Sequence, residues 1–222
     1  MASSWPVNGG SGREVLDRGP LRGRTRARHL LSRGPVLYGG QVTSFLGRDG
    51  WRWIAPPVSW ASENDSLAWR CHGKTDFWRI TEGHPAKHDG QALVVSVEGD
   101  FRLEAVFEAA LAERYDQTGL FAEVDEERWL KLGVELDEQF WLSAVHTRGE
   151  SDWSREPVPG LPIRLALERR SDSVFCSAHL EGAWRVFRVL HLPGLVAVGP
   201  YSCAPRGDGF ETSMRQARLT GG

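Results

Sequence analysis

The strongest constraint on the fold of this chain is the alternation of apolar and polar residues in short runs that begin near Gly50. In Phe101–Ala109, apolar side chains occupy every second position and most of the residues between them are charged. Successive side chains of a strand point to opposite faces, so this period predicts strands with one buried face. Similar runs at 161–168 and 184–189 are separated by turn signals. We therefore predict an all-β protein, a jelly-roll β-sandwich of two packed antiparallel sheets.

Three local features refine this prediction. The segment Glu104–Arg114 is rich in Ala, Glu and Leu and also suits a helix, but the strict alternation before Phe107 favours a strand. Glu181-Gly182 predicts a turn. The apolar run Leu195–Val198 predicts a short strand that ends at Gly199-Pro200.

The amino-terminal region differs from the rest of the chain in charge. Residues 1–34 contain seven Arg against Glu14 and Asp17, whereas the 222 residues together carry a net charge of −2. We predict that residues 1–47 form a basic, disordered Gly/Pro/Arg-rich extension and linker, and that residues 48–222 form the sandwich domain. An RNA-contacting arm and an organellar transit peptide are alternatives to a dispensable extension or an upstream start site, which we favour.

Composition excludes several classes of function. The near-neutral charge argues against nucleic-acid and membrane partners, and no apolar stretch is long enough for a transmembrane helix. The cysteines at 71, 176 and 203 are widely spaced and odd in number. They predict reduced thiols in a cytoplasmic protein rather than a disulfide framework or a zinc site.

One predicted hairpin carries an unusual surface. Its first strand covers residues 117–124, Asp125–Arg128 forms the turn, and the second strand covers residues 129–136. Alternation places Leu130, Leu132, Val134 and Leu136 on the core face. Side chains on the opposite face are Trp129, Lys131, Gly133 and Glu135. This mixture is unusual for a solvated face, and the absent side chain of Gly133 predicts a shallow groove.

Six motifs between residues 50 and 217 resemble the regulation-of-enolase protein family of the concanavalin A-like lectin/glucanase superfamily. They are, in order, Thr75-Asp-Phe-Trp78, Gly99-Asp-Phe101, Tyr115-Asp-Gln-Thr-Gly-Leu120, Trp129-x-Lys131-x-Gly133-x-Glu135, Ser151-Asp-Trp-Ser154 and Val198-Gly-Pro-Tyr-Ser-Cys-Ala-Pro205. The resemblance implies a β-sandwich and, for the family's best-known yeast member, a non-catalytic regulatory link to glycolysis. The basic amino-terminal segment lies outside it.

Strand alternation gathers a candidate ligand-binding surface from several of these motifs. Its members are Asp76, Trp78, Tyr115, Gln117, Trp129, Lys131, Glu135, Ser151, Asp152 and Trp153, the last three on a predicted loop. Aromatic rings stack on sugars, and carboxylate, amide, hydroxyl and ammonium groups hydrogen-bond sugar hydroxyls. We therefore predict a non-catalytic module that binds a carbohydrate or sugar phosphate without a cofactor, with Lys131 as the donor to a phosphate or hydroxyl group. A purely structural role for the same residues is the alternative, with Asp76 capping a turn.

Two other functions remain open. A glycoside hydrolase or lyase would use a pair of carboxylates, for which Asp76 and Glu135 are the candidates. A protein-docking regulator of a metabolic enzyme would use the same aromatic surface. The run Glu123-Val-Asp125-Glu-Glu127 resembles a glucanase motif only superficially, because it enters the predicted turn. His84 and His88 have the spacing of metal ligands but lie in a turn-rich loop, so we predict no metal site.

Overall fold

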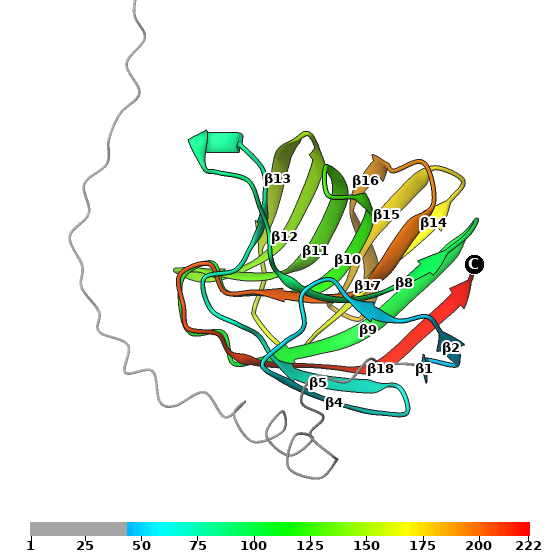
Figure 1. Cartoon of the computed structure of the whole chain (residues 1–222), viewed down its shortest axis with the longest axis horizontal. Helices are drawn as coiled ribbons and strands as arrows, with labels where there is room; N and C mark the ends of the chain where they lie inside the picture. The colour runs from blue at the N-terminus through cyan, green and yellow to red at the C-terminus, as the bar shows by residue number, and fades with distance from the viewer. Residues whose placement is uncertain (1–43) are drawn as a thin grey trace, which may run out of the picture.

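The computed structural model describes residues 44–222, which form two seven-stranded antiparallel sheets packed face to face (Figure 1). The front sheet has the order β13 (Glu150–Pro157), β12 (Gln139–Arg148), β11 (Arg128–Asp137), β10 (Gln117–Asp125), β17 (Val196–Cys203), β8 (Gln91–Val97) and β3 (Arg52–Trp53). The back sheet has the order β16 (Ala183–His191), β15 (Ser173–Leu180), β14 (Ile163–Arg170), β9 (Phe101–Ala109), β18 (Glu211–Gly221), β5 (Ser66–Arg70) and β4 (Ser59–Glu63). The predicted β-sandwich is confirmed, including the strand over Phe101–Ala109.

Two small elements flank the sandwich. β1 (Ser44–Phe45) pairs with β2 (Arg48–Asp49), and β6 (Phe77–Trp78) pairs with β7 (Lys87–His88). The 3-10 turn η1 (Thr81–Gly83) lies between β6 and β7. Residues 76–88, which include β6, η1 and β7 and which we call the arm, project beside β13 (Figure 1).

The main core lies between the sheets and follows the predicted alternation. Leu120 and Ala122 of β10 lie in it with Leu130 and Leu132 of β11, all of them buried. The two strands join through a tight turn between Asp125 and Arg128, as predicted.

A second apolar cluster covers the outer face of the front sheet. Phe121 of β10 and Trp129 of β11 point away from the main core, because they alternate with its residues. The arm contributes Phe77, which stacks on Phe121 with ring centroids 4.3 Å apart, and Tyr201 of β17 completes the group. The centre of the front sheet is therefore buried on both faces. Phe77 belongs to this second cluster and not to the main core.

Two strand boundaries differ from prediction. β17 continues past Gly199-Pro200 to Cys203, where the sequence predicted an end. The ladder between β17 and β8 is interrupted at these two residues, so the missing N–H of Pro200 breaks no hydrogen bond there. A Cβ on Gly199 would lie 1.7 Å from the carbonyl oxygen of Leu93, so only glycine permits this close approach. Ser151–Trp153, predicted as a loop, lies within β13.

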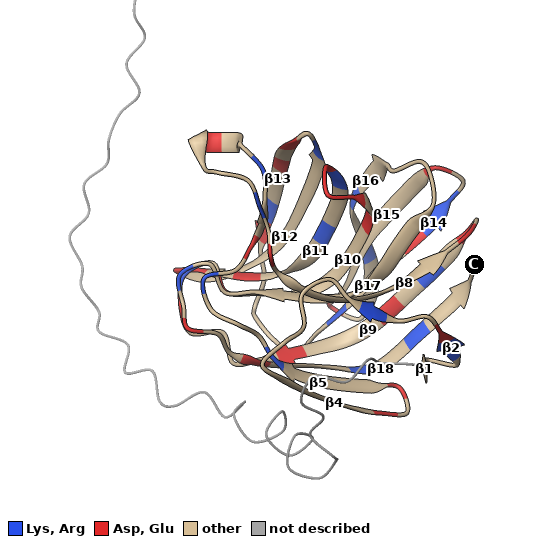
Figure 2. Ribbon diagram, viewed as in Figure 1, with Lys and Arg blue, Asp and Glu red and all other residues tan. Residues whose placement is uncertain are grey.

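The described chain begins ahead of the predicted domain start at Arg48. Phe45 is buried in the main core, and its carbonyl oxygen accepts a hydrogen bond from the Trp51 indole at 2.7 Å. The predictions for residues 1–43 lie outside the described residues. Within residues 44–222, no helix has the length and apolar character needed to span a membrane. Acidic and basic residues are interspersed over both sheets (Figure 2).

Leu132 offers a test of the main core. Leu132→Ala is expected to lower the free energy of unfolding by about 2–5 kcal/mol, because it leaves a cavity among closely packed side chains. The exposed Leu195 is the matched control. Leu195→Ala is expected to change the free energy of unfolding by less than about 0.5 kcal/mol. Urea denaturation measures both, and equal effects of the two substitutions would contradict this account of the core.

Candidate functional site

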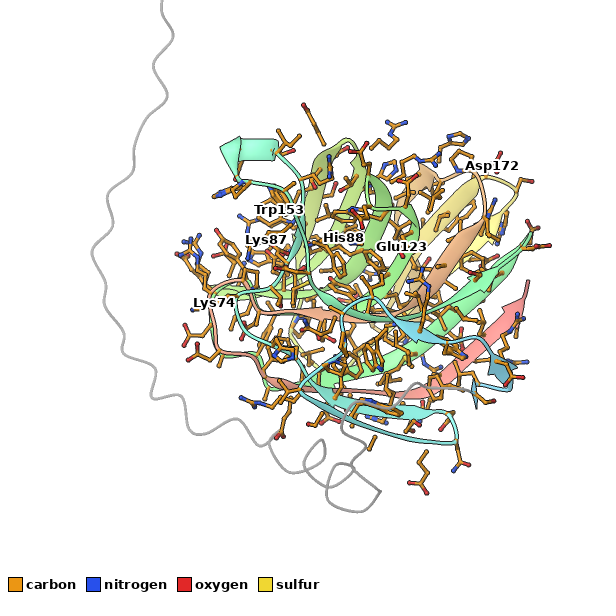
Figure 3. All side chains as sticks on the ribbon, viewed as in Figure 1. Lys74, Lys87, His88, Glu123, Trp153 and Asp172 are labelled. Atoms are coloured by element: carbon orange, nitrogen blue, oxygen red, sulfur yellow. The ribbon has the colours of Figure 1, made fainter. Side chains whose placement is uncertain are left out.

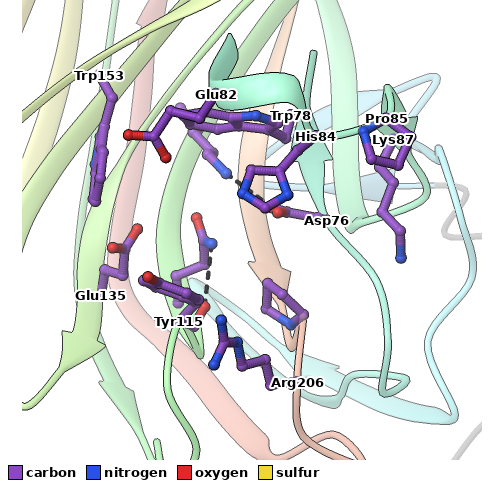
Figure 4. Close-up of a pocket in the computed structure, with 13 residues that line it drawn as sticks. Asp76, Trp78, Glu82, His84, Pro85, Lys87, Tyr115, Glu135, Trp153 and Arg206 are labelled. Atoms are coloured by element: carbon purple, nitrogen blue, oxygen red, sulfur yellow. Dashed lines mark hydrogen bonds and ion pairs between the residues drawn. The ribbon is translucent and has the colours of Figure 1, made fainter. Parts of the chain in front are cut away.

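A pocket of about 330 Å³ opens on the outer face of the front sheet, between the arm and strands β10, β11 and β13 (Figure 4). The loop after β17 completes its wall. The lining residues are Asp76, Trp78, Glu82, His84, Pro85, Lys87, Tyr115, Gln117, Lys131, Glu135, Trp153, Pro205 and Arg206. Seven of the ten predicted site residues are among them. Figure 3 shows Lys87 and Trp153 on the same side of the molecule.

Trp129 does not line the pocket. It shares the outer face with Lys131, as alternation predicted, but its ring is packed in the second cluster against Phe77 and Phe121. Its side chain is fully buried and its indole donates to the carbonyl oxygen of Glu126 at 3.2 Å. The ring is therefore not available to stack on a ligand, and it supports the pocket floor from below.

Ser151 and Asp152 also lie outside the pocket. The buried Ser151 hydroxyl accepts a hydrogen bond from the Arg79 amide at 2.9 Å, which attaches the arm to β13. Asp152 points away and pairs with Arg188 of β16 at 2.6 Å, joining the edge strands of the two sheets. Both residues therefore hold structural elements in place rather than contacting the pocket.

Lys131 is the electrostatic centre of the pocket floor. Its buried ammonium donates to Asp76 Oδ1 at 3.0 Å and to the carbonyl oxygen of Phe77 at 2.7 Å. Burial is the largest single influence and lowers the pKa of this lysine, but the neighbouring acidic groups together, led by Asp76 and including Glu135, outweigh it and the pKa is raised. Two of its three N–H groups are used, so Lys131 chiefly ties the arm to the sheet.

Glu135 differs sharply from Asp76 in its surroundings. It lies opposite Gln117 in the β10–β11 ladder and is buried, with only 4% of its surface exposed. Its Oε1 atom has no hydrogen-bond partner among residues 44–222. Burial raises the pKa of this carboxyl to about 7, against the opposing effect of Lys131 and with a further contribution from Asp76. Glu135 therefore lines the pocket as a buried carboxyl whose hydrogen-bonding capacity is not filled by the described chain.

The space above Gly133 is filled, so it is not the groove that the sequence predicted. A Cβ on Gly133 would lie 2.6 Å from the Tyr201 hydroxyl and 2.4 Å from the carbonyl oxygen of Thr118. Glycine at this position admits the Tyr201 ring beneath the pocket. The Tyr201 hydroxyl donates to Gln117 Oε1 at 3.4 Å, and Gln117 Nε2 donates to the Tyr115 carbonyl oxygen at 3.2 Å.

The aromatic side chains of the pocket are held by different contacts. Trp153 is fixed by a hydrogen bond from its indole to Ser143 Oγ at 2.9 Å, and Trp78 meets its ring edge-on at 6.2 Å. Tyr115 has a left-handed backbone with φ 71°, and two guanidinium groups lie within 5.0 Å of its ring centroid, those of Arg114 and Arg206. The guanidinium of Arg155 lies 4.6 Å from the centroid of the Trp153 ring, so a cation also covers part of that ring.

Sequence reasoning missed the pocket residues contributed by the arm and by the loop after β17. Glu82, His84, Pro85 and Lys87 come from the arm, and Pro205 and Arg206 from the loop. The arm folds back because Arg79 donates to the carbonyl oxygen of Gly149 at 2.9 Å and pairs with Glu127 at 2.8 Å. These anchors lie 48 and 70 residues away in sequence, so local patterns do not reveal them. Over the described chain, no group of three or more His, Cys, Asp or Glu side chains is arranged to hold a metal ion.

Two packed antiparallel sheets with a polar and aromatic pocket on one outer face define a concanavalin A-like β-sandwich protein. A legume lectin-like domain from Entamoeba histolytica has the same fold, with a TM-score of 0.51 and 9% identity over 78% of this chain and 90% of that domain. The profile of the family described as "Protein of unknown function (DUF1349)" matches residues 53–221. The chain belongs to this family.

Two comparisons with yeast proteins, one of sequence and one of structure, show similarity over most of this chain. The chain is 29% identical over 175 residues to "Regulation of enolase protein 1" of Saccharomyces cerevisiae, which covers 76% of this chain and 88% of the relative. A crystal structure of a functionally unknown protein from Saccharomyces cerevisiae has a TM-score of 0.73 and 27% identity over 78% of this chain and 96% of that protein. The resemblance predicted from the six motifs is confirmed.

The Lys131–Asp76 ion pair is expected to contribute to the stability of the folded protein. Lys131→Met is expected to lower the free energy of unfolding by about 3 kcal/mol, because it removes the cation that balances Asp76 and detaches the arm. The double variant Lys131→Met/Asp76→Asn is expected to recover part of this loss, since no unbalanced charge remains. Urea denaturation of the two variants checks this, and a double variant less stable than Lys131→Met would contradict it.

The raised pKa of Glu135 predicts how the free energy of unfolding depends on pH. Its pKa is about 7 in the folded protein against an ordinary value of 4.5, so between these values the folded state binds more protons than the unfolded chain. The free energy of unfolding therefore falls as pH rises from about 4.5 to 7, by up to about 3 kcal/mol in total. Glu135→Gln is expected to remove this fall, whereas the exposed Glu98→Gln is expected to retain it. Urea midpoints at pH 5 and pH 8 measure the difference, and identical pH profiles for Glu135→Gln and wild type would exclude a raised pKa.

Proposed function

We propose that the pocket binds a carbohydrate and that the protein is a non-catalytic binding or regulatory module. The observation that carries this proposal is a buried carboxyl with an unfilled acceptor, Glu135, in a pocket walled by Trp78 and Trp153. Figure 4 shows Trp153 and Glu135 on the same wall of the pocket.

Sugar chemistry matches this arrangement. A pyranose presents C–H groups on its faces, which pack on indole rings, and hydroxyl groups around its edge, which both donate and accept. The Glu135 carboxyl lines the pocket and can accept from one hydroxyl, and Gln117 lies opposite it in the β10–β11 ladder as a second polar group. An apolar ligand would leave Glu135 without a partner, which is costly for a buried polar group.

The name of the yeast relative supports a regulatory module. The yeast relative is called a regulator of enolase, which favours a link to a metabolic enzyme, and the lectin-like fold suits sugar binding. The second candidate function is accordingly a protein-docking regulator of a metabolic enzyme.

The three cysteines are buried and form no disulfide, which supports the predicted cytoplasmic location.

The enzymatic alternative would depend on Asp76 and Glu135. Glu135 has the raised pKa of a general acid, which favours this alternative. Asp76 Oδ1, however, already accepts hydrogen bonds from Lys131 and from the Phe77 amide. A carboxylate occupied in this way is a poor nucleophile or base, so we favour binding without turnover. Product analysis after incubation with a bound ligand separates the two, since turnover would consume it.

Binding is tested by titrating the full chain with monosaccharides, sugar phosphates and oligosaccharides while tryptophan emission is recorded. A saturable change is expected for at least one sugar. By calorimetry, Trp153→Ala is expected to weaken that binding about tenfold or more, because the indole supplies a stacking wall. Trp184→Ala is the matched control, since Trp184 lies on β16 outside the pocket and should leave the affinity unchanged. Binding that survives Trp153→Ala unaltered would contradict the proposed site, and a panel with no saturable change would shift the proposal to protein docking.

A further inference from the structure

The pocket lining also includes the guanidinium of the exposed Arg206, which has no ion-pair partner among residues 44–222. We propose, resting on the proposed function, that the bound carbohydrate carries an anionic group held by Arg206, while one of its hydroxyl groups donates to Glu135. The ligand class is thus an acidic or phosphorylated sugar rather than a neutral one. In Figure 4, Tyr115 lies between Glu135 and Arg206, so the two groups flank one aromatic ring.

Arg206 is held in position but is not neutralised. Its guanidinium lies 5.0 Å from the centroid of the Tyr115 ring, and its carbonyl oxygen accepts a hydrogen bond from Lys74. No carboxylate of the described chain lies within ion-pair distance of it. Arg114 shares the same ring but is paired with Asp137 at 2.6 Å. Of the two guanidinium groups over Tyr115, only that of Arg206 retains an unbalanced charge at the pocket.

The two lysines of the pocket are less available to an anion. Lys131 is paired with Asp76 beneath the floor. Lys87 donates to the carbonyl oxygen of Lys74 at 2.5 Å and lies 3.9 Å from the Asp89 carboxylate. The sequence predicted that Lys131 contacts a phosphate; we assign this contact to Arg206 instead. A guanidinium suits this role because its planar fork can donate two parallel hydrogen bonds to a phosphate or carboxylate.

The carboxylates of the pocket fix the direction of the ligand. Glu82 lines it together with Glu135, and an anion placed beside an ionised carboxylate would be repelled. The anionic group is consequently excluded from the Glu135 side and attracted to the Arg206 side. A neutral sugar would satisfy Glu135 but leave the Arg206 charge unused, which is the physical basis for preferring an acidic sugar.

Two matched ligand sets test this proposal on the full chain by calorimetry. They are glucose with glucose 6-phosphate and glucuronate, and galactose with galactose 6-phosphate and galacturonate; inorganic phosphate is added as a bare anion. In at least one set, an anionic sugar is expected to bind about tenfold or more tighter than its neutral parent. Arg206→Gln is expected to abolish this preference by weakening the binding of the anionic sugar about tenfold or more. Arg185→Gln, on the opposite sheet and paired with Glu181, is the control and should preserve it.

The outcomes separate this inference from the proposed function. Preference for the phosphate, for the carboxylate, or for both supports the inference and identifies the anion. Equal affinity for neutral and anionic sugars overturns the inference and leaves carbohydrate binding intact. Inorganic phosphate binding as tightly as the sugar phosphates also overturns it, because Arg206 would then recognise any anion. If none of these sugars binds, both this inference and the proposed carbohydrate-binding function are overturned.

Discussion

The pocket depends on one buried ion pair, between Lys131 of β11 and Asp76 at the start of the arm. A buried ammonium is costly unless a carboxylate and further acceptors surround it, and here the arm supplies both the Asp76 carboxylate and the Phe77 carbonyl oxygen. The charge of Lys131 therefore requires the arm to lie against the front sheet. Once it does, Phe77 covers the second cluster and Trp78 is placed at the pocket wall.

Burial then gives neighbouring carboxyl groups different properties. Asp76 is balanced by Lys131, whereas Glu135 lies four residues along the same strand as Lys131 and has no partner for Oε1 in the described chain. The same lysine thus stabilises one carboxylate fully and the other only through space, and burial dominates for Glu135. Asp76 and Glu135 therefore differ in their capacity to accept a hydrogen bond from a ligand.

Local alternation predicted most of the fold but only part of the site. It placed Trp129, Lys131 and Glu135 on one face correctly, because strand geometry fixes side-chain direction whatever covers the strand. It could not show that Trp129 is covered while Lys131 and Glu135 line the pocket, since Phe77 reaches Trp129 from 52 positions earlier in the chain. Arg206 was missed for the same reason, as its position over Tyr115 depends on a contact between distant loops.

The bridge between Asp152 and Arg188 has a consequence for the molecule as a whole. β13 and β16 are the terminal strands of their sheets, and terminal strands present unpaired backbone groups on which another chain can extend the sheet. Arg188 reaches across to the Asp152 carboxylate and to Ser154 Oγ, so a charged cluster lies where the two terminal strands meet. A neighbouring molecule that added a strand there would have to desolvate this cluster. The bridge thus protects the sandwich against aggregation through its open side.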